Sequence, residues 1–170
     1  MNVEIIQAKT TQQIAEVMEI RKKVFITEQN VPVELEIDEF EKTSTHFLAL
    51  VDGIPSGVGR LRLKHSYVKF ERIATLTTLR GAGVGRKLTT YMLEFARKAF
   101  PTYLPAMHAQ ESAIGFYKKL GWIEVGEKFL EAGIVHQVLI FPPDEEATRK
   151  KLKAHQDPHC REDIKAILKK

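Results

Sequence analysis

The sequence predicts a mixed α/β (α+β) fold, with a central sheet of about six to seven strands flanked by helices. Three observations support this prediction. Short apolar segments joined by turn residues occupy much of the first half, and segments with helical periodicity alternate with strands in the second half. Hydrophobic residues make up 44% of the chain, which is enough for a core of its own.

The first elements are a strand and an amphipathic helix. We expect a strand over residues 2–8, and Thr10 with Gln13 forms a capping box that begins the helix. The acidic segment 28–41 follows this helix. It carries Pro32 and lacks clear periodicity, so we expect a loop or a broken helix there.

A hairpin and a third strand come next. Strands are predicted over 46–51 and 58–63, on either side of a type I′ turn at Asp52-Gly53. A further strand is predicted over 68–76, directly before a glycine-rich turn. The remaining predicted elements are a long helix over 83–99, a strand over 103–109, a short helix over 112–120 closed by Gly121, and strands over 122–129 and 134–141 around Ala132-Gly133.

The chain length suits one domain with a modest tail. We expect a domain over 1–141 and a C-terminal helical extension over 142–170, which begins at Pro142-Pro143. Apolar residues near the end of this extension form a stripe on a short helix. This stripe is expected to pack against the domain or against a partner subunit, so the prediction leaves room for a homodimer.

The net charge of +4 is spread along the chain, which argues against a nucleic-acid partner. The apolar segments are too short to span a membrane, and the N-terminus lacks a signal-peptide pattern. Cys160 is the single cysteine, so no disulfide forms within the chain. We expect a cytoplasmic protein. No metal site is expected, because Pro158 separates Cys160 and His159 from His155 and no fourth ligand is evident.

The sharpest local feature is the turn Arg80-Gly81-Ala82-Gly83-Val84-Gly85-Arg86, between a strand and a long helix. Small residues let the backbone approach a ligand closely, and a helix N-terminus presents unpaired N–H groups with a positive dipole. These features favour a site for pyrophosphate. The alternative is a tight strand-to-helix turn that binds nothing.

Two common phosphate motifs do not match this turn. The dinucleotide pattern G-x-G-x-x-G fails at Arg86, and the P-loop pattern fails outright. The pattern R/Q-x-x-G-x-G does match, with Arg80, Gly83 and Gly85. This turn resembles the acyl-CoA pyrophosphate motif of the GNAT (GCN5-related) N-acetyltransferases.

A second motif strengthens the resemblance. The segment Phe116-Tyr117-Lys118-Lys119-Leu120-Gly121-Trp122 is similar to the tyrosine-bearing GNAT helix that ends in glycine and an aromatic residue. The predicted elements also follow the GNAT order, over roughly residues 2–141. The stretches 71–73 and 132–136 further resemble a small bacterial GNAT subgroup of poorly defined substrate.

The resemblance implies acetyl-CoA as cosubstrate and assigns residues to it. Backbone groups of a strand would pair with the pantetheine arm, the glycine turn would hold the pyrophosphate, and an amide would follow the next strand, where this chain has Gln110 in place of the usual Asn. The implied cofactor-binding residues are Ile73, Ala74, Thr75, Arg80, Gly81, Ala82, Gly83, Val84, Gly85, Arg86, Gln110 and Tyr117.

The resemblance also implies catalytic roles. Tyr117 matches the residue that hydrogen-bonds or protonates the departing thiolate, although a tyrosine at this helical position could equally be part of the core. For the base that deprotonates the amine, Glu71 is the first candidate and Glu28 the second. Glu71 could instead be a salt-bridged carboxylate. Further candidates are His46, His108 and His136, or a chain of water molecules in place of a single base.

Two functions therefore stay open from the sequence. The first is an N-acetyltransferase that moves acetyl from acetyl-CoA to a primary amine, a small cationic amine or a peptide amine, by direct attack in a ternary complex. The second is a non-catalytic acyl-CoA-binding sensor or interaction module. The acidic segment 28–41 would attract a cationic acceptor, or it is a solvated loop without that role.

Overall fold

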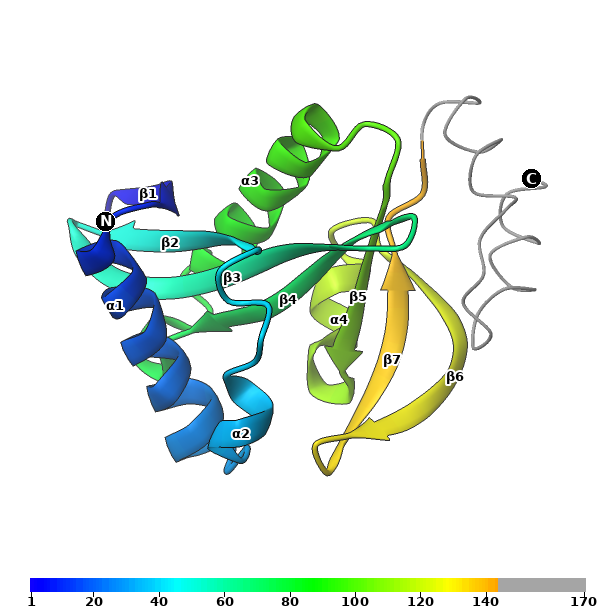
Figure 1. Ribbon diagram of the computed structural model, residues 1–170, viewed down its shortest axis with the longest axis horizontal. Helices are drawn as coiled ribbons and strands as arrows, with labels where there is room; N and C mark the ends of the chain where they lie inside the picture. Colours follow the sequence, from blue (N-terminus) through cyan, green and yellow to red (C-terminus); the bar gives the residue numbers. More distant parts are fainter. Residues whose placement is uncertain (144–170) are drawn as a thin grey trace. The chain divides into compact units, whose positions relative to one another are not determined.

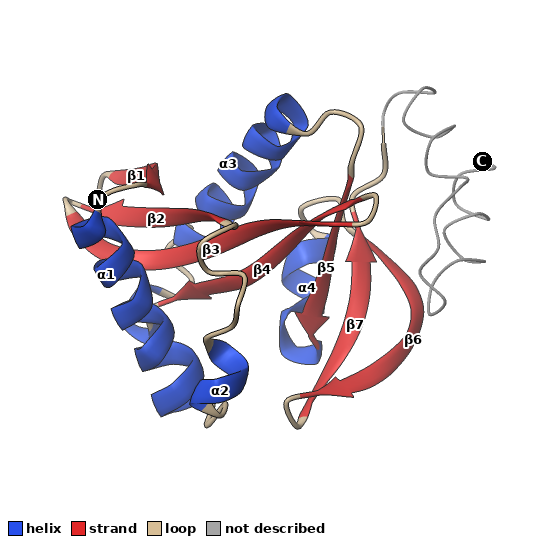
Figure 2. Ribbon diagram, viewed as in Figure 1, coloured by secondary structure: helices blue, strands red, loops and turns tan. Residues whose placement is uncertain are grey.

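The computed structural model describes residues 1–143, so all of the predicted extension except its two prolines lies outside the described residues. The described strands form one mixed sheet of seven, in the order β1-β2-β3-β4-β5-β7-β6, with helices beside it (Figures 1 and 2). The predicted fold class is confirmed. The strands are β1 (Val3–Ala8), β2 (Thr45–Val51), β3 (Ile54–Lys64), β4 (Tyr67–Thr75), β5 (Leu104–Gln110), β6 (Ile123–Glu131) and β7 (Ile134–Ile140).

The helices differ in length and type. The α-helices are α1 (Thr11–Arg21), α2 (Val33–Glu36), α3 (Val84–Ala99) and α4 (Ile114–Lys118). A π-helix, η1 (Lys22–Glu28), continues α1, and two 3₁₀ turns, η2 (Thr77–Leu79) and η3 (Glu111–Ala113), precede α3 and α4. Within the described residues, no helix combines the length and apolar character needed to cross a membrane.

The described chain divides into two compact units, one formed by residues 1–62 with 70–95 and the other by 63–69 with the residues from 96 onward. In the first unit, β1, β2 and β3 are antiparallel neighbours. Alternate residues of β2 enter different clusters. Leu48 packs in the cluster of α1, and Ala49 packs in the cluster of α3. Helices thus cover both faces of this part of the sheet (Figure 2).

The start of α1 agrees with its sequence signal. The side chain of Thr10 accepts a hydrogen bond from the backbone N–H of Gln13, and the side-chain oxygen of Gln13 accepts one from the backbone N–H of Thr10. The change to a π-helix at Lys22 was not predicted. It retains Val24 and Phe25 in the core while the chain turns toward α2.

In the second unit, β7 lies between β5 and β6 and is antiparallel to both. The turn from β6 to β7 has positive φ at Ala132 and Gly133, as the predicted hairpin requires. Buried residues from the three strands pack with Tyr67 into one cluster; the others are Leu104, Ala106, Val125, Val138 and Ile140.

Strand β3 and helix α4 depart from their predicted bounds, whereas the acidic segment agrees with its prediction. Strand β3 begins at Ile54 rather than at residue 58, because Ile54, Pro55 and Gly57 already pair with β2 directly after the turn. The acidic segment contains one short turn of helix, α2, which fits a broken helix. Helix α4 is shorter than predicted, because the chain first forms the 3₁₀ turn η3.

Candidate functional site

The turn between β4 and α3 adopts a backbone conformation that requires glycine at two positions. Gly81 has φ of +81° and Gly83 has φ of +86°, in the left-handed region that other residues rarely adopt. A Cβ built at either position meets no atom within 4 Å, so this face of the turn is open. Val84, the first residue of α3, is fully buried and anchors the helix start.

The N-terminus of α3 is therefore presented beside an open backbone surface. Lys87 donates to the carbonyl of Gly83, and it is among the first residues of α3 to make an intrahelical bond. The N–H groups before it point along the helix axis away from the helix, as at any helix N-terminus. Arg80, Arg86 and Lys87 are exposed beside these groups. Positive charge and free backbone donors at one turn suit an anionic ligand such as a pyrophosphate.

Strand β4 bends just before the segment that the sequence assigned to the pantetheine arm. Arg72 has φ of +54°, which is unusual for a residue with a side chain and interrupts a regular strand. Its guanidinium donates to the carbonyls of Leu35 and Glu36 and pairs with the carboxylate of Glu36 at 2.8 Å. The bend is thus tied to the segment around α2.

Buried and half-buried ion pairs connect α1, the α2 segment, β3 and β4. Arg21 and Arg60 are each only 1% exposed. Arg21 contacts Glu36 at 2.6 Å and Glu41 at 2.7 Å. Arg60 contacts Asp38 and Glu71, each at 2.7 Å. We call this set, with Arg62, Arg72 and Glu41, the arginine–carboxylate network; its members are Arg21, Arg60, Arg62, Arg72, Glu36, Asp38, Glu41 and Glu71.

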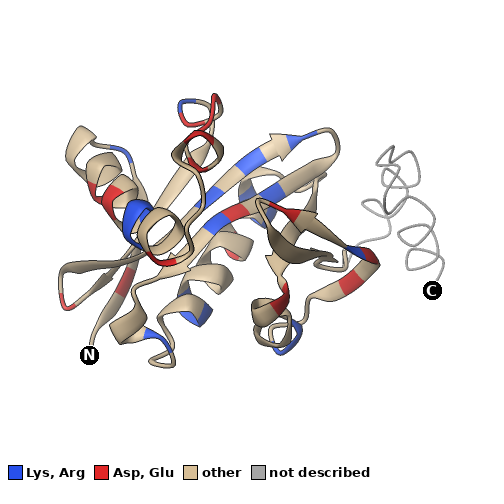
Figure 3. Ribbon diagram, turned by 90° about the horizontal axis from the view of Figure 1, so that it is seen from below, with Lys and Arg blue, Asp and Glu red and all other residues tan. Residues whose placement is uncertain are grey.

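The network changes the interpretation of the acidic segment. Its carboxylates Glu36, Asp38 and Glu41 are each held by an arginine from another element. Charges of both signs are interspersed along the described chain (Figure 3). Much of the negative charge that would attract a cationic acceptor is therefore compensated locally. The sequence alone gave no sign of this, because the partners are up to 36 positions apart.

Burial acts to raise the pKa of two of these carboxyl groups, but the net shift differs between them. Burial raises the pKa of Glu36, and the attraction of Arg21 and Arg72 does not fully offset it. Burial is also the largest influence on the pKa of Glu41 and acts to raise it, but the hydrogen bond from Arg21 together with the charges of Arg21 and Arg60 outweighs burial and leaves the pKa below its usual value.

The two carboxylates that the sequence favoured as bases both lie in ion pairs. Glu71 accepts from Arg60 at 2.7 Å and from Arg62 at 2.8 Å, so both its oxygens are engaged. Glu28 is held by Arg80 through both oxygens, at 2.6 and 2.8 Å. The hydrogen bond from Arg80, followed by that from Thr77, lowers the pKa of Glu28. These contacts favour structural roles over proton transfer.

Tyr117 lies on α4 in the second unit and is 7% exposed. Its ring makes edge contacts with the rings of Phe116 and Trp122, at centroid distances of 5.0 and 6.3 Å. Burial raises the pKa of the Tyr117 hydroxyl well above its ordinary value. The hydroxyl therefore stays protonated at neutral pH.

A carboxylate in the second unit is shared by two histidines. Glu131, at the end of β6, lies 3.1 Å from Nδ1 of His108 on β5 and 3.8 Å from Nε2 of His136 on β7. The ring of Phe129 packs against both imidazoles. Gln110 is the register partner of His136 and lies two residues after His108, so these side chains share one face of the sheet.

The tautomers follow from these contacts. Nδ1 of His108 faces a carboxylate, which only accepts, so Nδ1 carries the proton and Nε2 carries the lone pair. Nδ1 of His136 donates to the carbonyl of Ile134 at 2.8 Å. The hydrogen bond from His108 is the first of the causes that lower the pKa of Glu131. Sequence analysis named both histidines but missed Glu131, whose role depends on strand pairing.

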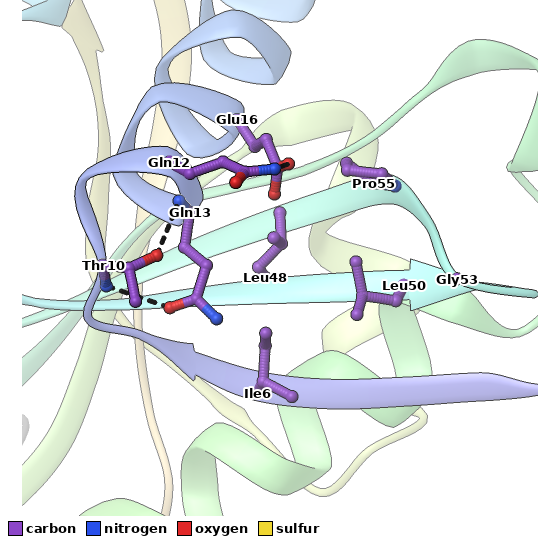
Figure 4. A pocket seen from close by; sticks show the side chains of 9 residues that line it. All are labelled: Ile6, Thr10, Gln12, Gln13, Glu16, Leu48, Leu50, Gly53 and Pro55. Atoms are coloured by element: carbon purple, nitrogen blue, oxygen red, sulfur yellow. Dashed lines mark hydrogen bonds between the residues drawn. The ribbon is translucent and has the colours of Figure 1, made fainter.

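A cavity of about 280 Å³ lies elsewhere in the first unit, between the start of α1 and strands β1 and β2 (Figure 4). The polar groups of Gln12 and Gln13 that border it already bond to Glu16 and to the backbone at Thr10. None of the sequence-predicted site residues lines it. In the described part of the chain, no group of three or more His, Cys, Asp or Glu residues could hold a metal ion, and Cys160 lies outside that part.

Comparison with known proteins agrees with this picture. A family model described as an acetyltransferase (GNAT) domain matches residues 5–139. The chain is 41% identical over 130 residues to the uncharacterised N-acetyltransferase YjcF of Bacillus subtilis, covering 76% of this chain and 92% of that protein. It shares its fold with an acyl-CoA N-acyltransferase from Pseudomonas aeruginosa, with a TM-score of 0.73, 23% identity, and 83% and 99% of the two chains covered.

A further structural neighbour is a GNAT family acetyltransferase from Elizabethkingia anophelis with acetyl-CoA bound. It has a TM-score of 0.60 and 17% identity, with 82% and 95% of the two chains covered. The family model and the Bacillus subtilis relative identify the chain as an acyltransferase that uses acetyl-CoA. The chain belongs to the GNAT acetyltransferase family, whose members use acetyl-CoA as cosubstrate.

The arginine–carboxylate network predicts a pH dependence of stability through His46. Nε2 of His46 donates to the carbonyl of Glu41, and Nδ1 is buried without a hydrogen-bond partner among the described residues. Burial lowers the pKa of His46, because it disfavours the charged ring, and the contacts with Glu41 offset this only in part. The nearby charges of Arg21 and Arg60 lower the pKa further. The unfolded chain then binds the proton more tightly than the folded chain.

We therefore expect stability to fall as the pH drops below about 6.5, with a slope of at most about 1.4 kcal/mol per pH unit from this residue. His46→Gln should flatten that part of the profile, measured by urea unfolding between pH 7.5 and 5.5. The exposed His65, changed to Asn, is the control and should leave the profile unaltered. An equal slope in His46→Gln and the wild type would contradict the assignment.

Proposed function

We propose that the chain transfers the acetyl group of acetyl-CoA directly to a primary amine in a ternary complex, without a covalent enzyme intermediate. The observation that carries this proposal is the open glycine turn at the start of α3, with Gly81 and Gly83 at positive φ. Membership of the GNAT family supports the acetyl donor. The amine and the direct mechanism are our inference.

In this proposal the glycine turn and β4 hold the cosubstrate. Backbone N–H groups of the turn from Gly81 to Arg86 would bind the pyrophosphate, apart from that of Ala82, which donates to the carbonyl of Leu79. Arg80 and Arg86 would supply positive charge. Backbone groups of Ile73–Thr75 on β4 pair with the pantetheine arm as an added strand would. An N–H on this strand would donate to the carbonyl oxygen of the thioester as negative charge develops there.

The family resemblance also assigns roles to Gln110 and Tyr117. The amide of Gln110, at the end of β5, would bond the pantetheine arm. The hydroxyl of Tyr117 would donate to the sulfur as the thiolate departs. Because burial raises its pKa, Tyr117 is a weaker acid than the thiol it would protonate. A hydrogen bond that stabilises the sulfur, with late proton transfer, therefore fits this tyrosine better than early protonation.

For the base we propose His108, one of the three histidines that the sequence left as candidates. Its Nε2 carries the lone pair, and Glu131 would stabilise the ring once that nitrogen takes a proton from the amine. Its imidazole is 28% exposed, so a substrate or water has access to it. Glu71 and Glu28 are less suited, since arginines engage both oxygens of each.

The role of Tyr117 separates an enzyme from an acyl-CoA-binding module. We expect Tyr117→Phe to lower kcat about 10²-fold, within the range for loss of one proton-donating group. The affinity for acetyl-CoA should stay nearly constant, because the ring and its packing remain. The assay is thiol release with a panel of polyamines and lysine peptides, beside calorimetric binding of acetyl-CoA. An unaltered kcat would remove Tyr117 from the mechanism.

The role of His108 predicts a pH signature. His108→Gln should lower kcat/KM about 10²-fold and remove the rise of the rate with pH on the acidic side. Glu131→Gln should have a smaller effect on kcat/KM, because a neutral amide stabilises the protonated ring less than a carboxylate does. The matched control is His65→Asn, an exposed histidine in the turn between β3 and β4. If His108→Gln keeps the wild-type pH profile, another group accepts the proton.

A further inference from the structure

Arg80 and Glu28, both in the first unit, form a bidentate ion pair. Glu28 is the last residue of the π-helix η1, and Arg80 begins the glycine turn, 52 positions later. The two nitrogens Nη1 and Nη2 of Arg80 reach the two carboxylate oxygens at 2.6 and 2.8 Å. This is the two-pronged arrangement in which arginine also binds phosphate.

The remaining contacts complete an anion site around Glu28. The hydroxyl of Thr77, in the 3₁₀ turn before Arg80, donates to the same carboxylate at 2.9 Å. Nε of Arg80 donates to the carbonyl of Thr75 at 3.2 Å. Three of the five N–H donors of Arg80 are thus occupied by groups of the chain itself. One of these groups, Thr75, belongs to the strand proposed to pair with pantetheine.

The ion pair between Arg80 and Glu28 is exposed enough to dissociate easily. The side chains of Arg80 and Glu28 are 43% and 37% exposed. Exposed ion pairs contribute little to stability and are screened by salt. A ligand with two phosphate groups and further contacts to the turn interacts more strongly with the Arg80 guanidinium than a single exposed carboxylate does. Displacement therefore needs no large rearrangement of the fold.

We propose that Glu28 is an internal counter-anion: its carboxylate occupies the fork of Arg80 and the Thr77 hydroxyl until the pyrophosphate of CoA takes its place, and it thereby sets the affinity for the cosubstrate. This inference rests on the proposed function. It gives Glu28 a role at the cofactor site instead of the proton transfer that the sequence suggested.

Electrostatic repulsion determines whether the charge of Glu28 raises or lowers the affinity for CoA. When a pyrophosphate binds at the turn, the negative charge of Glu28 lies beside a second anion and repels it. Glu28→Gln keeps the size and hydrogen-bonding capacity of the side chain and removes the charge. The variant should therefore bind CoA more tightly. A residue whose role was only to orient Arg80 would give the opposite result.

The experiment is calorimetric titration of wild type and Glu28→Gln with CoA and with dephospho-CoA, at low and high salt. We expect about three- to tenfold tighter binding by Glu28→Gln, with a smaller difference at high salt. The gain should be the same for dephospho-CoA, which lacks the 3′-phosphate but keeps the pyrophosphate. Glu19→Gln, an exposed charge change on α1, is the control and should bind within about twofold of wild type.

An Arg80→Ala background isolates the pair. There, Glu28→Gln should give a smaller gain in affinity, because the fork for which the two anions compete is gone and only the repulsion between them remains. Equal or weaker binding by Glu28→Gln in the wild-type background would overturn the inference, and so would an undiminished gain in the Arg80→Ala background. If neither wild type nor Glu28→Gln binds CoA, the proposed function itself fails, and that outcome is distinct from normal binding by wild type without a gain in the variant.

Discussion

Backbone geometry at the turn between β4 and α3 is the constraint on which the proposed chemistry depends. Gly81 and Gly83 take positive φ, and Val84 is buried directly after them. Residues with a side chain would strain this path, and a side chain on either glycine would project into the open face. The turn therefore fixes where α3 begins and leaves its N-terminal donors accessible to an anion.

Charge compensation is the second organising feature of the first unit. Two almost fully buried arginines, Arg21 and Arg60, join the acidic segment to α1, β3 and β4. Breaking one partner would leave a buried charge, so these pairs constrain the position of the segment more than they add stability. The same principle appears at the glycine turn, where Glu28 neutralises Arg80 at the surface rather than in the core.

These pairs show that a stretch of acidic residues need not produce a negative surface, because arginines from other elements neutralise its carboxylates. Glu36, Asp38 and Glu41 lie in a stretch without Lys or Arg, yet all three contact arginine. Recognition of the acceptor amine therefore depends on fewer uncompensated charges than composition suggests. Glu131, which is 51% exposed and bridges toward two histidines, is a carboxylate of a different kind.

Local signals in the sequence were sufficient for much of the fold. The capping box at Thr10, the Asp52-Gly53 turn and the glycine turn before α3 each act over a few residues, and each is present in the structure. The π-helix was not predictable from periodicity, because its pattern departs only slightly from that of an α-helix. The pairs Glu28–Arg80 and His108–Glu131 join residues 52 and 23 positions apart, so only strand order and packing reveal them.

The most direct test of the account is calorimetric titration of the purified protein with acetyl-CoA, beside NAD and ATP. Acetyl-CoA carries the pyrophosphate and the pantetheine arm that the glycine turn and β4 are proposed to hold, whereas NAD and ATP lack pantetheine. We predict binding of acetyl-CoA in the micromolar range and no comparable binding of the other two. Failure to bind acetyl-CoA, or equal binding of all three, would contradict the assignment of this turn as an acyl-CoA site.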